Sequence, residues 1–294
     1  KKPNKAISMK TDGNGRYVYL NPRRGGQIAV AESARNVVCT GAAPLAITNC
    51  LNFGNPYKPE MFYLFREAVA GMGDACRVFD TPVTGGNVSF YNESPDSAVY
   101  PTPVVGMVGL IEDIAHRTTS SFKTDGDLIY LIGETRAEIG GSEFLKEYYR
   151  QVSGDCPDLD LEKEKQIQQT VLTLIRKGWV ASAHDLADGG LAVALAESCI
   201  TDRNRKIGAT IKLTPPDMRP EWYLFSESQS RFLISVSPQN QDSFESFLEK
   251  EKVECNNLGT VGGRELVIND WIKLPVSQLE KIYYQTLHEK MESY

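Results

Sequence analysis

The segment Thr81-Pro82-Val83-Thr84-Gly85-Gly86-Asn87-Val88-Ser89-Phe90-Tyr91-Asn92-Glu93 holds the most informative pattern in this sequence. Its paired glycines let backbone amides approach a ligand without interference from a Cβ atom, and successive N–H groups in such a turn form a concave anion site. Asn87 and Ser89 lie two residues apart, so in an extended segment their side chains share one face. The combination suits a phosphate beside a hard cation, but Gly-Gly-Asn is also an ordinary turn signal before a strand.

Composition indicates a globular protein with two domains. The chain has 294 residues, of which 41% are hydrophobic and 24% charged, and this length favours two domains. The net charge of −6, without any basic run, excludes a nucleic-acid-binding face. No apolar stretch approaches the roughly 20 residues that a membrane helix needs.

The cysteines indicate the redox compartment of the protein, and the N-terminus indicates how much of the protein the chain represents. Six cysteines are scattered without a C-x-x-C pair, and the three histidines do not cluster with them. We therefore expect reduced thiols in a cytoplasmic protein and no zinc site. The sequence opens on Lys1-Lys2-Pro3, with neither an initiator Met nor a signal core, so we expect an excised piece of a longer protein.

Residues 1–117 are predicted to form a first unit. Glycine, proline and apolar spacing predict its elements in this order: a strand at Ala6–Met9, an extended segment at Arg16–Leu20, a helix that stops at Gly41, a strand at Pro44–Asn49, a loop at 51–56, a helix from Pro59, the glycine loop, and strands at Ser89–Asn92 and Val104–Ile111.

Residues 118–294 are predicted to form a second unit after a polar linker at 118–127. Its expected helices are Leu161–Lys177, Gly190–Cys199 and Val276–Met291, and its expected strands are Leu128–Ile132, Trp179–Ala183, Ala209–Leu213, Arg231–Val236 and Leu266–Ile268. In the last helix, Leu279, Ile282, Tyr283 and Leu287 are expected to face inward. Helices and strands mix without regular βαβ alternation, which favours the α+β class.

Three further polar turns each allow two interpretations. Asp12, in Thr11-Asp12-Gly13-Asn14-Gly15, could hold Mg²⁺ or only make an Asx turn. The helix after His184-Asp185-Leu186-Ala187-Asp188-Gly189-Gly190 could receive an anion at its N-terminus or be capped by an Asp. Residues 225–231 could bind a polar small molecule or form a solvated strand edge.

Catalysis by His184 is not expected, because neighbouring strand residues face opposite ways and no nucleophile accompanies it. The sequence also contains neither a Walker loop nor a dinucleotide-binding fingerprint. The residues alone thus predict a two-domain protein that binds a phosphorylated ligand.

Several blocks in sequence order resemble a known family. The blocks 25–36, 39–49, 51–56 and 85–89 are similar to the C-terminal half of the synthetase subunits of phosphoribosylformylglycinamidine synthases, and 184–190 and 227–231 continue the match. The resemblance implies an internal duplication. Each half then consists of an aminoimidazole ribonucleotide synthetase-like N-terminal domain, a β-sheet or half-barrel with helices, and a C-terminal α/β sandwich.

The resemblance implies an ATP-dependent C–N ligase that acts in purine biosynthesis. This enzyme converts formylglycinamide ribonucleotide, ATP and glutamine-derived ammonia to formylglycinamidine ribonucleotide, ADP and phosphate, with ATP and Mg²⁺ as cofactors. The implied partners are the N-terminal half of the same subunit, a glutaminase subunit and a small accessory subunit. Alone, the piece is expected to pair with a second copy.

Two other functions remain open at this stage. The isolated piece could act only as a nucleotide-binding or structural module without turnover. A paralogous selenophosphate or thiamine-phosphate enzyme would require an intact lysine or acidic cluster near the N-terminus, which Lys1–Met9 does not show.

The resemblance also assigns residues. It implies that Gly86 contacts ATP, Asn87 binds Mg²⁺ and Ser89 contacts the substrate. Asn49 occupies an ATP-contacting position that is commonly Asp in the family, so a hydrogen bond that it accepts would lack charge assistance.

The chain's own second site is expected to be degenerate. Arg35 and Asn36 stand at substrate-type and metal-type positions of that site. The catalytic histidines and the ATP-binding lysine belong to the other half, and Thr11–Arg16 contains no histidine, so no catalytic residue is expected in this chain.

Overall fold

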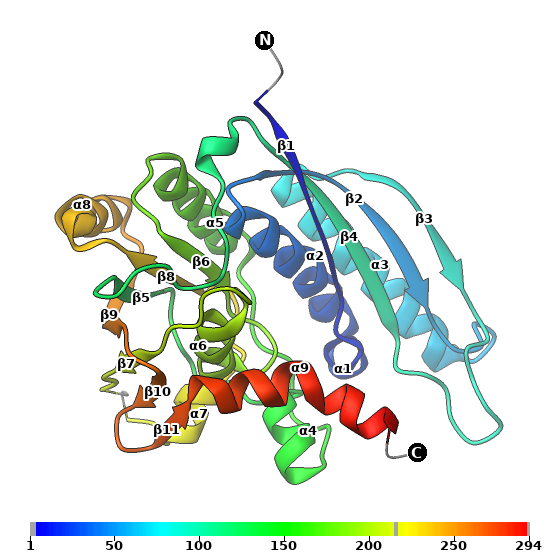
Figure 1. Cartoon of the computed structure of the whole chain (residues 1–294). Helices are drawn as coiled ribbons and strands as arrows, with labels where there is room; N and C mark the ends of the chain where they lie inside the picture. Colours follow the sequence, from blue (N-terminus) through cyan, green and yellow to red (C-terminus); the bar gives the residue numbers. More distant parts are fainter. Residues whose placement is uncertain (1–3, 215–216, 293–294) are drawn as a thin grey trace.

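The computed structural model describes residues 4–214 and 217–292 of the chain. It contains two β-sheets, each packed against helices, and these lie side by side in Figure 1. The expected α+β class with two domains is confirmed. Within the described residues, no helix combines the length and the apolar character needed to cross a membrane.

The first sheet is built from residues 6–111. Its elements are β1 (Ala6–Asp12), α1 (Gly15–Leu20), α2 (Pro22–Cys39), β2 (Ala43–Asn52), α3 (Pro59–Phe79), β3 (Val83–Ser89) and β4 (Thr102–Ile111). The strand order is β1-β4-β2-β3. Strand β4 runs antiparallel to both of its neighbours, whereas β3 runs parallel to β2 and forms an edge of the sheet.

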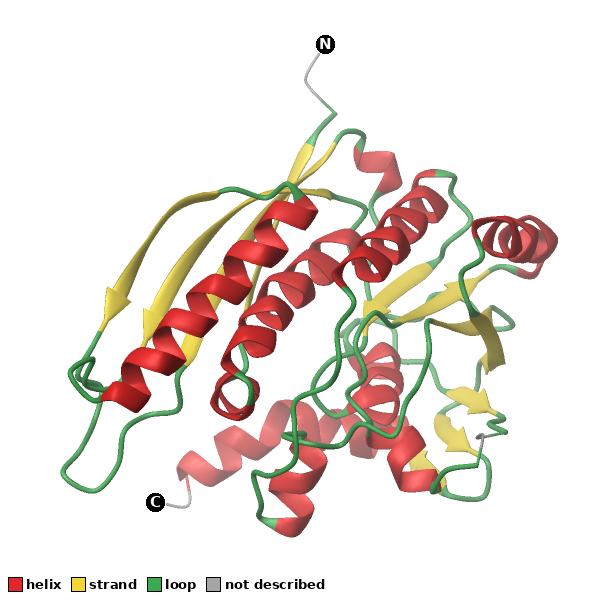
Figure 2. Cartoon of the chain, turned by 180° about the vertical axis from the view of Figure 1, so that it is seen from behind, coloured by secondary structure: helices red, strands yellow, loops and turns green. Residues whose placement is uncertain are grey.

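Helices α2 and α3 cover only one face of this sheet, as Figure 2 shows. Strand β4 alternates accordingly, with Val105, Met107 and Ile111 buried in the core beneath the helices. The opposite face has no helix over it. There Ile7 and Met9 of β1 are 70% and 77% exposed, so the sheet presents an apolar face that nothing in the described chain covers.

The second sheet is built from residues 128–275. Its strands are β5 (Leu128–Ile132), β6 (Ser182–Asp185), β7 (Ala209–Ile211), β8 (Phe232–Val236), β9 (Cys255–Val261), β10 (Glu265–Ile268) and β11 (Ile272–Pro275). The helices that accompany it are η1 (Ile114–His116), α4 (Glu143–Tyr149), α5 (Leu161–Arg176), α6 (Gly190–Ile200), α7 (Pro220–Phe225), η2 (Pro238–Asn240), α8 (Gln241–Glu251) and α9 (Val276–Glu292).

Both faces of the second sheet are buried, unlike those of the first. The strand order is β11-β10-β7-β9-β5-β8-β6. Along β5, Ile129 and Leu131 pack into the core beneath α6 and α7, whereas Tyr130 and Ile132 pack into the core beneath α5 and α8. Because successive side chains of a strand point to opposite faces, β5 contributes residues to two cores, one on each side of the sheet.

Three local predictions for the first sheet are wrong. Arg16–Leu20 is not extended but lies in α1, because the Asn14 side chain accepts hydrogen bonds from the amides of Arg16 and Tyr17 at its start and caps the helix. Gly85 and Gly86 do not form a turn but lie inside strand β3. The predicted strand Ser89–Asn92 ends at its first residue, since β3 stops at Ser89.

The predicted inward face of the last helix is present only at its start: Leu279 packs against the core, but the other three residues do not. Only Val276 of α9 is buried, and Ile282, Tyr283 and Leu287 are 57%, 52% and 71% exposed. Figure 1 shows the reason: α9 starts beside β11 and then runs past the edge of the second sheet towards the C-terminus. Its apolar spacing is helical, but the second sheet is too short to cover it.

Candidate functional site

The predicted nucleotide and substrate residues all lie on the paired strands β2 and β3. In the parallel register, Asn49 lies opposite Gly86, Cys50 opposite Asn87, and Asn52 opposite Ser89. Residues 83–88 are exposed along the whole length of β3. An edge strand leaves alternate N–H and C=O groups without a strand partner, so this strand offers backbone hydrogen-bond groups to a ligand.

The register divides the four residues between the two faces of the sheet. Asn49 pairs with the buried Val105 of β4, which places it on the side that carries the helices. Asn87 and Ser89 are one and three positions beyond Gly86, so their side chains share a face, as the sequence predicted, and the register makes this the open face. A ligand that contacts all four residues must therefore run along the outer edge of β3.

Position 86 requires glycine for a structural reason. Its φ of +154° is rarely adopted by other residues, and a Cβ atom there would lie 2.2 Å from Asn49 Oδ1 and 2.4 Å from the Asn49 carbonyl oxygen. Asn49 and Gly86 are therefore in direct contact. Gly85 differs, since a Cβ atom on it would meet nothing within 4 Å.

The donors for a magnesium ion on this chain are few. Asn87 provides one neutral oxygen, and the described residues contain no group of three or more His, Cys, Asp or Glu side chains arranged to hold a metal. Mg²⁺ usually keeps several waters and binds substrate phosphates beside one or two protein ligands. The residues present therefore fit a shared ion only, to which Asn87 supplies one ligand.

A second polar region lies between the two sheets, and it is closed. Arg35 on α2 is fully buried; its Nη1 lies 3.1 Å from Glu164 Oε1, and its Nη2 donates to Gln229 Oε1 at 2.8 Å. Glu164 also accepts from Gln168 and Ser230. The sequence singled out Arg35 but not Glu164, which looks like an ordinary surface position of a helix.

Residues 226–231 are neither a ligand-binding edge nor a solvated one. All six are buried, and Glu227 accepts hydrogen bonds from the amide of Gly189 at 2.7 Å, the amide of Glu143 at 2.9 Å and the hydroxyl of Tyr17. Burial raises the Glu227 pKa to about 7, and the nearby Asp188 adds to the shift.

The carboxylate of Glu227 thus occupies the N-termini of two helices. The N-cap residue of α6 is Gly189, and no side chain of the 184–190 turn makes a capping hydrogen bond to this helix. The anion that the sequence allowed at the start of α6 is supplied by the chain itself, since the positive end of a helix favours a carboxylate.

Asp12, Asn36 and Asp185 meet where β1, α2 and β6 converge. Asn36 Nδ2 donates to Asp12 Oδ2 at 3.2 Å and to Asp185 Oδ2 at 3.0 Å. Burial raises the pKa of Asp12 to about 7, although Lys10 beside it opposes the shift. These residues line a pocket of about 200 Å³. Glu32, Asp188 and Glu197 also line this pocket, but among the described residues no three His, Cys, Asp or Glu side chains are arranged to hold a metal.

His184 is an ion-pair residue of the same region. Its Nε2 lies 2.9 Å from Glu197 Oε2, and its Nδ1 lies 2.7 Å from the Asp185 carbonyl oxygen and 3.4 Å from Oδ1. Burial alone would lower the His184 pKa, but the hydrogen bonds to Asp185 and Glu197 raise it to about 10. A permanently protonated imidazole cannot act as a general base near neutral pH.

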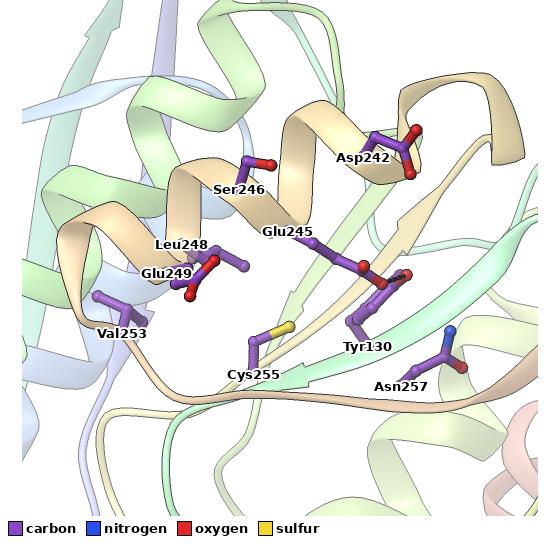
Figure 3. Close-up of a pocket in the computed structure, with 9 residues that line it drawn as sticks. All are labelled: Tyr130, Asp242, Glu245, Ser246, Leu248, Glu249, Val253, Cys255 and Asn257. Carbon is purple, nitrogen blue, oxygen red and sulfur yellow. Dashed lines mark hydrogen bonds between the residues drawn. The ribbon is translucent and has the colours of Figure 1, made fainter.

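A larger pocket, of about 490 Å³, lies between helix α8 and strands β5 and β9 of the second sheet (Figure 3). Helix α8 contributes Asp242, Glu245 and Glu249 to its lining, and Glu245 Oε1 accepts a hydrogen bond from the Tyr130 hydroxyl at 2.6 Å. Three carboxylates without a cation among the lining residues repel phosphate groups. This pocket is therefore not the nucleotide site.

Sequence comparison places both sheets in one family. The profile for AIR synthase related protein, N-terminal domain, matches residues 2–111, and the profile for the C-terminal domain matches residues 124–270. The chain belongs to the AIR synthase related family. Among its relatives, the phosphoribosylformylglycinamidine synthase subunit PurL of Moorella thermoacetica is 53% identical over 264 residues.

The chain spans only part of this relative. The aligned region is 90% of this chain and 36% of the Moorella protein. Thermotoga maritima PurL shows the same relation: the structure complexed with FGAR gives a TM-score of 0.78 at 22% identity, covering 94% of this chain and 46% of that one. The structure complexed with ATP gives a TM-score of 0.72 over similar shares.

The fold of the family also occurs in an enzyme that is not named PurL. The thiamine-monophosphate kinase of Stenotrophomonas maltophilia superposes with a TM-score of 0.64 at 15% identity, covering 92% of this chain and 87% of the kinase. Because this fold serves a kinase as well, the fold of an AIR synthase related protein does not by itself identify the reaction.

Proposed function

We propose that this chain is one half of an ATP-dependent PurL-type ligase of de novo purine biosynthesis in the cytoplasm. The other half of the subunit completes the active site. The reaction converts formylglycinamide ribonucleotide, ATP and ammonia to formylglycinamidine ribonucleotide, ADP and phosphate. The 53% identity to a phosphoribosylformylglycinamidine synthase subunit supports the reaction class, and the part of the relative left uncovered leaves room for a second half.

The outer edge of β3 is the part of this chain that we assign to the reaction. Gly86 and Asn49 contact the nucleotide, Asn87 provides one ligand to Mg²⁺, and Ser89 contacts the substrate. The observation that supports this most directly is the register, which brings Asn49 and Gly86 into contact and sets Asn87 and Ser89 along one exposed edge. The unpaired backbone groups of an edge strand are suited to phosphate oxygens.

These residues can position and stabilise, but they cannot transfer protons. The glycinamide carbonyl oxygen of the substrate attacks the γ-phosphorus of ATP, and ADP leaves. Ammonia then adds to the activated glycinamide carbon, and phosphate departs with the former carbonyl oxygen, which leaves the amidine. Magnesium, when bound, neutralises charge on the transferring phosphoryl group. The chain's contribution is electrostatic and geometric, through neutral oxygens and amides at the β3 edge.

The exposed apolar face of the first sheet is proposed as the contact with the other half. Ile7 and Met9 stand on this face beside Val108 and Leu110 of β4. We propose a division of the chain at residues 117 and 118, with the first unit making this contact. The isolated chain would cover the face by pairing with a second copy, and a strict monomer in sedimentation at micromolar concentration would contradict this.

Further partners follow from the PurL type. We propose that a glutaminase subunit delivers the ammonia and that a small accessory subunit joins the assembly. A solved Thermotoga maritima assembly is named PurLQS, which supports partner subunits of this kind.

The decisive experiment compares the chain alone with the complete subunit. We expect no amidine synthesis by the isolated chain in the presence of ammonium, ATP and Mg²⁺, and activity when the other half is added. Turnover by the isolated chain would refute a shared site and contradict the closed region around Arg35 and Glu227. Absence of turnover by the isolated chain is also expected of the alternative function, in which the chain is a nucleotide-binding or structural module without turnover.

A binding measurement separates these two functions. In calorimetric titrations of the complete subunit with ATP and Mg²⁺, Asn87→Ala should weaken binding about tenfold, which corresponds to about 1.4 kcal/mol. Asn256→Ala removes an equally exposed strand amide on the far sheet and should leave binding unchanged. Equal affinities for the Asn87 variant and the wild type would favour the structural module.

A further inference from the structure

The end of β3 is held by a turn that reaches back to the end of β2. Asn92 Nδ2 donates to the Ser89 carbonyl oxygen at 2.8 Å and to the Phe53 carbonyl oxygen at 3.1 Å. The same nitrogen lies 3.1 Å from Ser89 Oγ, and Asn92 Oδ1 lies 3.3 Å from that hydroxyl. One amide therefore contacts both oxygens of Ser89 and ties them to the neighbouring strand.

The turn itself is fixed at three successive residues. The amide of Tyr91 donates to the Gly54 carbonyl oxygen at 3.1 Å, and the amide of Asn92 donates to the Phe53 carbonyl oxygen at 3.1 Å. Glu93 accepts from the amide of Asn55 and from Lys58 Nζ, both at 3.1 Å. Tyr91 adopts a φ of +61°, a conformation that persists in non-glycine residues only where the surroundings determine it.

This arrangement leaves Ser89 with little freedom. A serine hydroxyl on an exposed strand end ordinarily rotates among three staggered positions. Here the Asn92 amide is anchored by two backbone carbonyls, so it cannot turn away from the hydroxyl without losing both hydrogen bonds. The hydroxyl is thus oriented before any ligand arrives, and such preorganisation lowers the cost of binding.

We infer that Asn92 is a positioning residue, which holds the Ser89 hydroxyl in the orientation that receives the formylglycinamide ribonucleotide substrate. This inference rests on the proposed function, because it presumes that Ser89 contacts the substrate. Asn92 acts through Ser89 and does not itself touch the reacting atoms. Its loss should therefore raise the substrate KM and leave the ATP KM and the kcat nearly unchanged.

A nearby residue supplies a matched control. Asn52 lies opposite Ser89 in the register, and its amide donates to the carbonyl oxygens of Cys50 and Thr102 at 3.1 Å and 3.2 Å. It has the same chemistry and partly buried setting as Asn92, yet none of its hydrogen bonds goes to Ser89. Asn52→Ala should therefore leave the substrate KM unchanged, although it also removes two bonds to backbone carbonyls.

The test is a double-mutant cycle in the complete synthetase subunit, with ammonium chloride as the ammonia source. Asn92→Ala should raise the KM for formylglycinamide ribonucleotide about five- to tenfold, the range for one lost hydrogen bond. Ser89→Ala should raise it at least as much. Adding Asn92→Ala to Ser89→Ala should then have no further effect on KM, because the residue that Asn92 orients is gone.

The possible outcomes separate the inference from the proposed function. If Ser89→Ala raises KM but Asn92→Ala does not, or if the two effects multiply in the double variant, Asn92 is not a positioning residue. If Ser89→Ala itself leaves KM unchanged, the substrate role of Ser89 fails and the inference falls with it. Should Asn92→Ala fail to fold, Asn92→Asp keeps the side-chain shape but removes the donor, and the same rise in KM is expected.

Discussion

The outer edge of β3 and the closed region between the sheets both contain polar residues. They differ in whether these residues find hydrogen-bond partners within the chain. At the edge, Asn87 is exposed on a strand that has a partner on one side only. In the closed region, Arg35 and Glu227 are fully buried and bonded within the chain. A polar group whose partners are all internal stabilises the fold, whereas one without such partners is available to a ligand.

The physical basis of this difference is the coverage of the two sheets. Helices cover one face of the first sheet, so its far face and its outer strand stay open. Between the sheets, α2 packs against α5 and β6 and brings Arg35 beside Glu164. Buried charges must be paired, because an isolated ion loses its hydration on burial. The comparison predicts large stability effects in the closed region and small ones at the edge.

The largest effect is expected for Arg35→Ala. The substitution leaves Glu164 fully buried without its cation, which typically destabilises a protein by about 3–5 kcal/mol. The matched control is Arg23→Ala on the same helix, whose pair with Asp74 is solvent-exposed and should contribute about 1 kcal/mol or less. Chemical denaturation measures both, and similar losses for the two variants would contradict the contrast between buried and exposed polar groups.

An intermediate effect is expected for the ion pair of His184, and it should depend on pH. The folded-state pKa of His184 is raised from 6.5 to about 10, so its stabilisation is complete below pH 6.5 and is lost as the pH rises towards 10. The difference in unfolding free energy between wild type and His184→Gln should therefore shrink from pH 6 to pH 9.5, by on the order of 2 kcal/mol.

The control for this substitution is the exposed His288 on α9. At pH 6, His288→Gln should change the unfolding free energy by less than about 0.5 kcal/mol, because it alters only an exposed side chain. A difference for His184→Gln that stays constant with pH would show that the imidazole is not held protonated by Glu197 and Asp185.

The smallest effect is expected for Asn87→Ala. Its side chain is exposed and makes no hydrogen bond with the described residues, so the unfolding free energy should change by less than about 0.5 kcal/mol. Thermal unfolding of the isolated chain checks this, and the same variant weakens ATP binding in the proposed function. A loss of 2 kcal/mol or more would place Asn87 among the structural residues and would sharpen the boundary between the two regions.

Several features of the fold could be predicted because they depend on local pattern. The helix from Pro59 and the strand Leu128–Ile132 follow from apolar spacing and a proline at a helix start, and both are present. The shared face of Asn87 and Ser89 follows from the period of a strand. Helix α1 was missed because its start depends on one Asn14 cap, which outweighs the extended pattern of Arg16–Leu20.

By itself, the sequence determined the α+β class, the approximate bounds of the elements with strong apolar spacing, and the resemblance from which the residues of the β3 edge were chosen, because periodicity and short motifs are local properties. Tertiary structure alone decided that Gly86 sits in a strand against Asn49, that α9 leaves its apolar face exposed, and that Glu227 caps two helices instead of meeting a ligand. Each of these depends on which distant segment covers a residue, and burial and partner choice are not encoded in neighbouring positions along the chain.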